Sequence, residues 1–233
     1  MNSSASLHAV IAPLEHLFTQ CSHSSQLLAQ QLTQLLTSLV STAAPTELAA
    51  TAFPKTTIEA LINRTLSDNC FCSGAGFAYH ADAPLNPQAK GSLYWIYKDT
   101  SHDTALELTA LTQQHLDFRT FEWFLKTKSL KGPYFHGPYV DYICNTSYTM
   151  TSAAPIFIHD CFYGVAAIDI LVSRIEDEIL NVLPQPRPKM VLTNTFGRVI
   201  FSTLTGYRVG DILRSEALAV VHQHPLFSLY LPA

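Results

Sequence analysis

Charged residues are scarce in this chain of 233 residues, since Lys, Arg, Asp and Glu together make up 14% of it. Globular proteins usually carry about a quarter. The hydrophobic share of 48% is ample for a sizeable core, which excludes a disordered chain. The net charge is −4, and the few basic residues form no stripe along the sequence. Nucleic acid is therefore not expected as a partner.

Long apolar runs and targeting signals are also missing. No run approaches the roughly 18–20 apolar residues that a membrane span needs, and the N-terminus lacks the segments of a signal peptide. The five cysteines are an odd number, and their spacing suggests no disulfide framework. We expect a cytoplasmic, reduced protein whose natural start is Met1. The alternative is a periplasmic or extracytoplasmic location, if the chain is a trimmed fragment of a receptor.

Ten histidines suggest a metal site at first sight, but their spacing does not support one. Three of them share an expected helix at separations of eight and seven residues, too far apart to hold one ion: His8, His16 and His23. The compact pairs have no second pair at the spacing of structural zinc sites: Cys70 with Cys72, and His222 with His224. In a strand, Cys70 and Cys72 would simply be small apolar residues of one face. We predict no metal and no cofactor.

A cysteine nucleophile with a histidine base is the enzymatic alternative, of the hydrolase type. Cys144 or Cys161 would be the nucleophile, and His136 or His159 the base. Neither cysteine lies in a nucleophile elbow or a protease signature, and Cys161 falls on a strand expected to be buried. We therefore predict that the protein is not an enzyme.

The clearest periodicity lies in residues 5–41, where apolar residues recur at alternating steps of four and three. The seam consists of Leu7, Ile11, Leu14, Phe18, Cys21, Ser25, Leu28, Leu32, Leu35 and Leu39. This pattern predicts a long helix. Further apolar residues widen the stripe, namely Val10, Leu17, Leu27, Leu36 and Val40. The helix could thus serve a dimer partner on one side and its own domain on the other. The alternative is a long helix that packs only on its own domain.

The rest of the chain reads as short helices and strands divided by turns. Helices are expected at 57–66 (capped by Thr56 or Thr57), 106–116, 120–129, 173–182 and 215–222. Strands are expected at 69–79, 92–97, 142–151, 154–158 and 161–170, with a turn at His159-Asp160 and a hairpin over 189–202. Residues 184–188 read as a linker. Gly74-Ala-Gly76 is too short for a phosphate loop, and close backbone packing in a strand explains it better.

Aromatic residues and isolated acids are concentrated between residues 117 and 169. Asp169 interrupts an apolar strand, where a carboxylate needs a hydrogen bond or a cationic partner. Trp123, Phe124, Tyr139 and Asp141 precede it. Aromatic walls with a few convergent polar groups are typical of small-molecule sites, and acids beside aromatic rings suit an ammonium group. The alternative is that these aromatics are ordinary core residues and the acids cap turns.

The order of these residues resembles a Cache domain, also called a PDC sensor domain, of the double type. That family shows the pattern Asp-Pro-Arg-x-x-x-Trp-Tyr, Pro-Tyr-x-Asp, Pro-Val/Ile, then Gly-Val-x-x-x-Asp-Ile/Leu. The corresponding segments here are Asp117-Phe-Arg119-Thr-Phe-Glu-Trp123-Phe124, Pro138-Tyr139-Val-Asp141, Pro155-Ile156 and Gly164-Val-Ala-Ala-Ile-Asp169-Ile170. Residues 190–210 resemble the start of the family's membrane-proximal module.

The resemblance implies an α+β fold in three parts. Residues 1–45 would form the long N-terminal helix, 46–183 a PAS-like antiparallel sheet module that binds the ligand, and 184–233 an abbreviated second PAS-like module. It also implies which residues line or shape the ligand pocket, and that Asp169 holds an ammonium group of the ligand. The pocket residues are Phe121, Trp123, Phe124, Tyr139, Asp141 and Asp169.

Three departures from the family pattern bear on the ligand. Phe121 stands where amino-acid receptors place the Arg that grips the ligand carboxylate, while Phe124 and Leu116 replace tyrosines. Among amines, amino acids and carboxylates we therefore prefer an amine. The chain shows neither the membrane helix nor the output domain of typical members. We expect a free-standing, non-catalytic sensor that signals through an unidentified output protein or through a homodimer. A scaffold that dimerises without any ligand is the other alternative.

Overall fold

The computed structural model describes residues 3–42, 54–80, 92–98, 105–107, 117–142, 146–214 and 216–233. The chain divides into two compact units. The larger unit comprises Cys21–His136 and Thr151–Asp169, and the smaller unit comprises Met1–Gln20, Gly137–Met150 and Ile170–Ala233. The sequence-based boundaries near residues 45 and 183 stay predictions.

The long N-terminal helix is confirmed as α1 (Ser3–Thr42), which contributes residues to both units. Its apolar seam is buried within the single chain, at Leu14 and Phe18 in the smaller unit and at Cys21, Leu28 and Leu32 in the larger one. The helix thus packs on its own domain, which both interpretations required. Of the residues that widen the stripe, Leu27 is exposed. The dimer remains a prediction.

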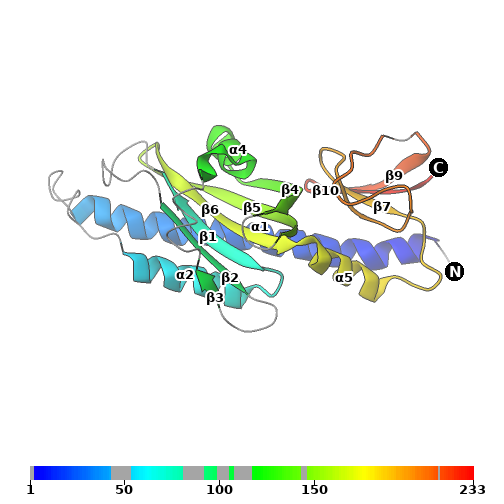
Figure 1. Ribbon diagram of the computed structural model, residues 1–233, viewed down its shortest axis with the longest axis horizontal. Coiled ribbons are helices and arrows are strands. Elements are labelled where there is room, and N and C mark those ends of the chain that lie inside the picture. Colours follow the sequence, from blue (N-terminus) through cyan, green and yellow to red (C-terminus); the bar gives the residue numbers. More distant parts are fainter. Residues whose placement is uncertain are drawn as a thin grey trace. The chain divides into compact units, whose positions relative to one another are not determined.

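A six-stranded sheet has the order β3-β2-β1-β6-β5-β4 (Figure 1). Its strands are β1 (Gly74–Tyr79), β2 (Ser92–Lys98), β3 (Ala105–Glu107), β4 (Tyr134–Asp141), β5 (Ser147–Ile158) and β6 (Cys161–Leu171). The pairs β1–β2, β1–β6 and β2–β3 are antiparallel. The predicted turn at His159-Asp160 is confirmed, and both residues have the positive φ that a two-residue hairpin turn requires.

Three further elements of the larger unit are α2 (Lys55–Asp68), the 3-10 turn η1 (Phe118–Thr120) and α4 (Glu122–Leu130). In Figure 1, α2 and α4 lie on opposite sides of the six-stranded sheet. The predicted cap of α2 is wrong, since Pro54 precedes the helix and no side chain caps it. The strand expected from residue 69 begins only at Gly74.

The helix expected over residues 106–116 is wrong where it can be checked, because residues 105–107 form strand β3. They pair with β2, Leu106 lying opposite Tyr97. Pairing with a neighbouring strand outweighs the helix-like local pattern. Residues 108–116 lie outside the described part of the chain.

The smaller unit contains α5 (Val172–Val182) and a four-stranded sheet of order β8-β7-β10-β9. These strands are β7 (Val191–Asn194), β8 (Val199–Ser202), β9 (Leu218–Gln223) and β10 (Phe227–Pro232). The predicted hairpin and α5 are confirmed, but the helix expected at 215–222 is wrong. There Leu218–Gln223 pairs with β10 as an edge strand. No helix in the described ranges is long and apolar enough to cross a membrane.

Candidate functional site

Three residues form a row across the middle of the six-stranded sheet: Tyr97 on β2, Gly74 on β1 and Asp169 on β6. Residues directly opposite one another project to the same face. Because Gly74 has no side chain, the Tyr97 ring can lie across β1, and its hydroxyl donates to Asp169 Oδ2 at 2.8 Å. A Cβ on Gly74 would be only 2.7 Å from Tyr97 Cε1.

Asp169 is the buried acid predicted to hold a ligand, and it is only 2% exposed. Besides Tyr97, the Thr151 hydroxyl on β5 donates to its Oδ1 at 2.6 Å. The fold therefore positions this carboxylate through two hydroxyl donors.

The next row along the strands consists of Trp95 on β2, Gly76 on β1 and Ala167 on β6. A Cβ on Gly76 would lie 2.2 Å from Trp95 Cε3 and 2.4 Å from the backbone oxygen of Tyr94. The indole thus lies directly on the glycine backbone. The prediction that Gly74-Ala-Gly76 serves close packing is confirmed.

We expect Gly76→Ala to destabilise the protein by about 1–3 kcal/mol, because the methyl group must displace either the Trp95 ring or the β2 backbone. Urea denaturation followed by circular dichroism would measure the change. Gly206→Ala is the matched control, since a Cβ there meets no atom within 4 Å. Equal stability of the two variants would contradict this packing.

Aromatic side chains from η1 and α4 continue from the Trp95 ring. The Trp123 ring centroid is 6.2 Å from that of Trp95 and 5.9 Å from that of Phe121. Trp95 in turn neighbours Tyr97 at 6.1 Å. We call this group the aromatic cluster; its members are Trp95, Tyr97, Phe118, Phe121, Trp123 and Phe124. The Tyr97 hydroxyl joins it to Asp169.

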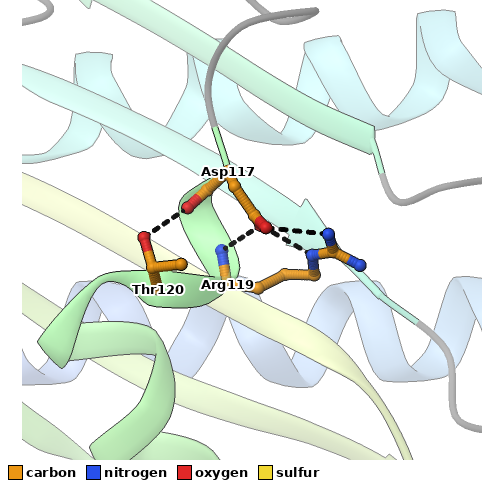
Figure 2. A network of polar contacts seen from close by, with 3 residues as sticks. All are labelled: Asp117, Arg119 and Thr120. Carbon is orange, nitrogen blue, oxygen red and sulfur yellow. Dashed lines mark hydrogen bonds and ion pairs between the residues drawn. The ribbon is translucent and has the colours of Figure 1, made fainter.

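Asp117 and Arg119 fix the entry of the chain into η1 (Figure 2). The Asp117 carboxylate accepts from the Arg119 backbone N–H at 3.2 Å, and from Arg119 Nε at 2.6 Å and Nη2 at 2.8 Å. The Thr120 hydroxyl donates to the Asp117 carbonyl at 2.8 Å. Both charged residues are exposed. They form a local cap that sets the start of the segment carrying Trp123.

The Arg119 side-chain hydrogen bond holds the pKa of Asp117 below its usual value of 3.8. A carboxyl whose folded pKa is lowered stabilises the fold above its unfolded pKa, and this contribution is lost as the pH falls through the folded pKa. We expect Arg119→Gln to raise the pKa of Asp117 back toward 3.8. Carboxyl carbon NMR over pH 2–6 would measure it, and an Asp117 pKa unaffected by the substitution would contradict the pairing.

The structure brings together some of the predicted site residues. Phe121, Trp123 and Phe124 form part of the aromatic cluster, and Asp169 lies in the same unit. Tyr139 and Asp141 lie on β4 in the smaller unit, where Asp141 is buried and Tyr139 half-buried. Their role in a site stays a prediction.

Sequence reasoning missed three residues around Asp169: Trp95, Tyr97 and Thr151. A signal for two of them was present. Trp95 and Tyr97 have the same two-residue spacing as Gly74 and Gly76, which is the spacing of side chains on one face of a strand. Thr151 gave no such signal, because its contact with Asp169 depends on the register between β5 and β6.

The cysteines differ in part from expectation. Strand β6 is buried as predicted, but Cys161 at its first position is exposed. Cys70 precedes β1 and is exposed, whereas Cys72 is buried, and burial raises its pKa to about 12. Cys144 lies outside the described residues. Within the described ranges, no three His, Cys, Asp or Glu side chains are grouped to hold a metal ion.

Two solved structures show the same fold. The sensory domain of the Campylobacter jejuni chemoreceptor Tlp3, with isoleucine bound, matches with a TM-score of 0.63 at 10% identity, covering 99% of this chain and 90% of that one. The ligand-binding domain of the Pseudomonas aeruginosa amino acid chemoreceptor PctC, in complex with GABA, matches with a TM-score of 0.54 at 15% identity. That match covers 95% of this chain and 92% of the other.

The sequence itself carries the family assignment. No curated protein sequence matches it significantly. Residues 58–177, more than half of the chain, match the model of the methyl-accepting chemotaxis protein-like, first PDC sensor domain. The matched range contains β1, α4, the aromatic cluster and Asp169, and it confirms the resemblance to PDC sensors. The chain therefore belongs to the family of methyl-accepting chemotaxis protein-like first PDC sensor domains.

Proposed function

We propose that this chain is a non-catalytic sensor that binds a small metabolite carrying an ammonium group. The observation that carries the proposal is the buried Asp169 carboxylate, fixed by Tyr97 and Thr151 at the edge of the aromatic cluster. A buried carboxylate favours a cationic partner. Aromatic faces nearby add cation–π attraction to the charge pairing.

Phe121 is the reason to prefer an amine over an α-amino acid held at both ends. The resemblance places an Arg at this position in receptors that grip a carboxylate. Here the Phe121 ring meets Trp123 edge to face. An uncharged aromatic offers a carboxylate no counterion, so the ammonium group would provide most of the charge recognition.

The structural relatives support the ammonium part of the proposal. Isoleucine, bound by Tlp3, and GABA, bound by PctC, both carry an amino group, although their carbon skeletons differ. Both ligands also carry a carboxylate. The relatives thus support recognition of a metabolite that carries an amino group. What else the ligand carries has to be inferred from this chain's own residues.

Signalling is proposed to pass through α1, to a homodimer partner or an output protein. This helix contributes residues to both compact units, and its Ser25 is hydrogen-bonded to Ser152, next to Thr151 on β5, at 2.9 Å. A ligand that changes the position of Thr151 could therefore act on the helix. A ligand can shift the protein from one conformation to another only by as much as its affinity for the two conformations differs.

Calorimetry and thermal shift with matched compounds test the proposal. Isoamylamine, L-leucine and 4-methylpentanoate have similar apolar tails and differ in their charged groups. We expect the amine and the amino acid to raise the melting temperature and the carboxylate to leave it unchanged. Tight binding of the carboxylate alone, unaffected by Asp169→Asn, would overturn the proposal. If no metabolite raises the melting temperature, the scaffold alternative is favoured.

A further inference from the structure

The indole nitrogen of Trp95 is a buried hydrogen-bond donor that no acceptor in the described part of the chain satisfies. The residue is 6% exposed. Buried polar groups nearly always have a partner, and an indole N–H can only donate. This donor therefore needs an acceptor, and an acceptor atom of a bound ligand would satisfy it. The family assignment to sensor domains gives reason to expect such a ligand.

The position of this nitrogen ties it to Asp169. Trp95 Nε1 lies 3.0 Å from the point where a Cβ on Gly74 would be, and Tyr97 Cε1 lies 2.7 Å from the same point. Gly74 is directly opposite Asp169 in the sheet. The donor thus lies over the same row of residues that carries the proposed ammonium acceptor.

We propose that Trp95 determines specificity by donating its indole hydrogen to an uncharged acceptor of the ligand. The ligand class is then an amine with a carbonyl or hydroxyl oxygen a few bonds away, such as an amino amide or an amino alcohol. This inference rests on the proposed function, because Asp169 must hold the ammonium group. It adds a second contact that selects among amines.

The ligand's acceptor is expected to be uncharged because of the balance of charge around Asp169. One ammonium group neutralises Asp169, and a ligand carboxylate would then bring a second negative charge into a buried region. No member of the aromatic cluster or of the Tyr97–Gly74–Asp169 row is cationic, and His80 lies beside Phe124 of the cluster, with ring centroids 6.3 Å apart. Arg119 is close in sequence, but both its Nε and Nη2 donate to Asp117. A neutral N–H matches a neutral oxygen in such surroundings.

Calorimetry with three probes of equal tail length tests the inference: isoamylamine, L-leucinamide and L-leucine. For the native chain we expect L-leucinamide to bind about three- to tenfold more tightly than isoamylamine, the range of one added hydrogen bond. Trp95→Phe should remove this advantage. Trp123→Phe is the control, because it also shrinks an aromatic ring of the cluster but should weaken both probes alike.

Indole NMR provides a second measurement, in which the ligands are added to the native chain. The chain has two tryptophans, Trp95 and Trp123, so its spectrum contains two indole N–H signals, which Trp123→Phe assigns. We expect L-leucinamide to shift the Trp95 signal downfield, and isoamylamine to leave it nearly in place.

The outcomes separate the two proposals. Suppose that isoamylamine and L-leucinamide both bind, that neither moves the Trp95 signal, and that Trp95→Phe weakens the binding of both equally. The inference is then overturned, while the proposed function stands. If L-leucine binds most tightly of the three, the uncharged acceptor is wrong. If none of the three binds to the native chain, the proposed function and the inference both fall.

Discussion

Asp169→Asn is expected to weaken binding of an amine ligand at least tenfold. The substitution keeps the shape of the side chain and removes the charge that an ammonium group would meet in a buried place. Hydrogen bonds to charged groups are worth about 1.5–3 kcal/mol, which corresponds to roughly 10- to 150-fold in affinity. Calorimetry with isoamylamine would measure the loss.

The same substitution should have a separate effect on stability. Tyr97 and Thr151 both donate to the carboxylate, and an amide nitrogen in place of one oxygen forces one of these hydroxyls to accept a hydrogen bond instead of donating one to this side chain. We expect a loss of about 1–2 kcal/mol in urea denaturation. Tyr97→Phe is the control, since it removes one hydrogen bond and keeps both the ring and the charge. Should Tyr97→Phe abolish amine binding as fully as Asp169→Asn does, the charge would not be the recognised feature.

Trp123→Ala is expected to produce the largest loss of stability, about 3–5 kcal/mol, because it empties the centre of the aromatic cluster. Trp123 is buried and its ring lies within 6.2 Å, centroid to centroid, of those of Trp95, Phe121 and Phe124. Thermal and urea denaturation would measure the change. Binding of isoamylamine should be lost as well, since Trp95 would no longer be held from the α4 side.

Leu125→Ala is the control for this substitution. Leu125 lies on the same helix, two residues further on, and is 51% exposed. We expect its replacement to change stability by less than about 0.5 kcal/mol. A Trp123→Ala variant as stable as Leu125→Ala would contradict the central position of Trp123 and, with it, the cluster as a binding site.

Much of the fold could be predicted from sequence because it depends on local periodicity. The seam of residues 5–41 predicted α1 to within two residues at its start and one at its end. The pair His159-Asp160 between two strand patterns predicted the turn of the β5–β6 hairpin, and both residues have the positive φ of such a turn. The two elements predicted wrongly, β3 and β9, are strands that pair with β2 and β10, respectively. That pairing is tertiary information, which a local pattern does not contain.

The candidate site was predictable only in part, for the same physical reason. Asp169 and Trp123 stood out because a buried acid is costly and the resemblance marked both positions. Trp95 and Tyr97 were assigned simply to a strand, although Tyr97 donates to Asp169 and the Trp95 ring lies beside that of Tyr97. Their role depends on the register that sets Gly74 and Gly76 beside them, and on the ring positions that these glycines permit.

A crystal structure of the chain with a bound amine would show directly whether Asp169 holds the ligand. We expect the ligand nitrogen to lie about 2.7–3.2 Å from a carboxylate oxygen of Asp169, with the aromatic cluster around the rest of the ligand. With an amino amide, the oxygen should lie at hydrogen-bond distance from Trp95 Nε1. A ligand bound elsewhere, with Asp169 contacting only the protein's own donors, would contradict the account.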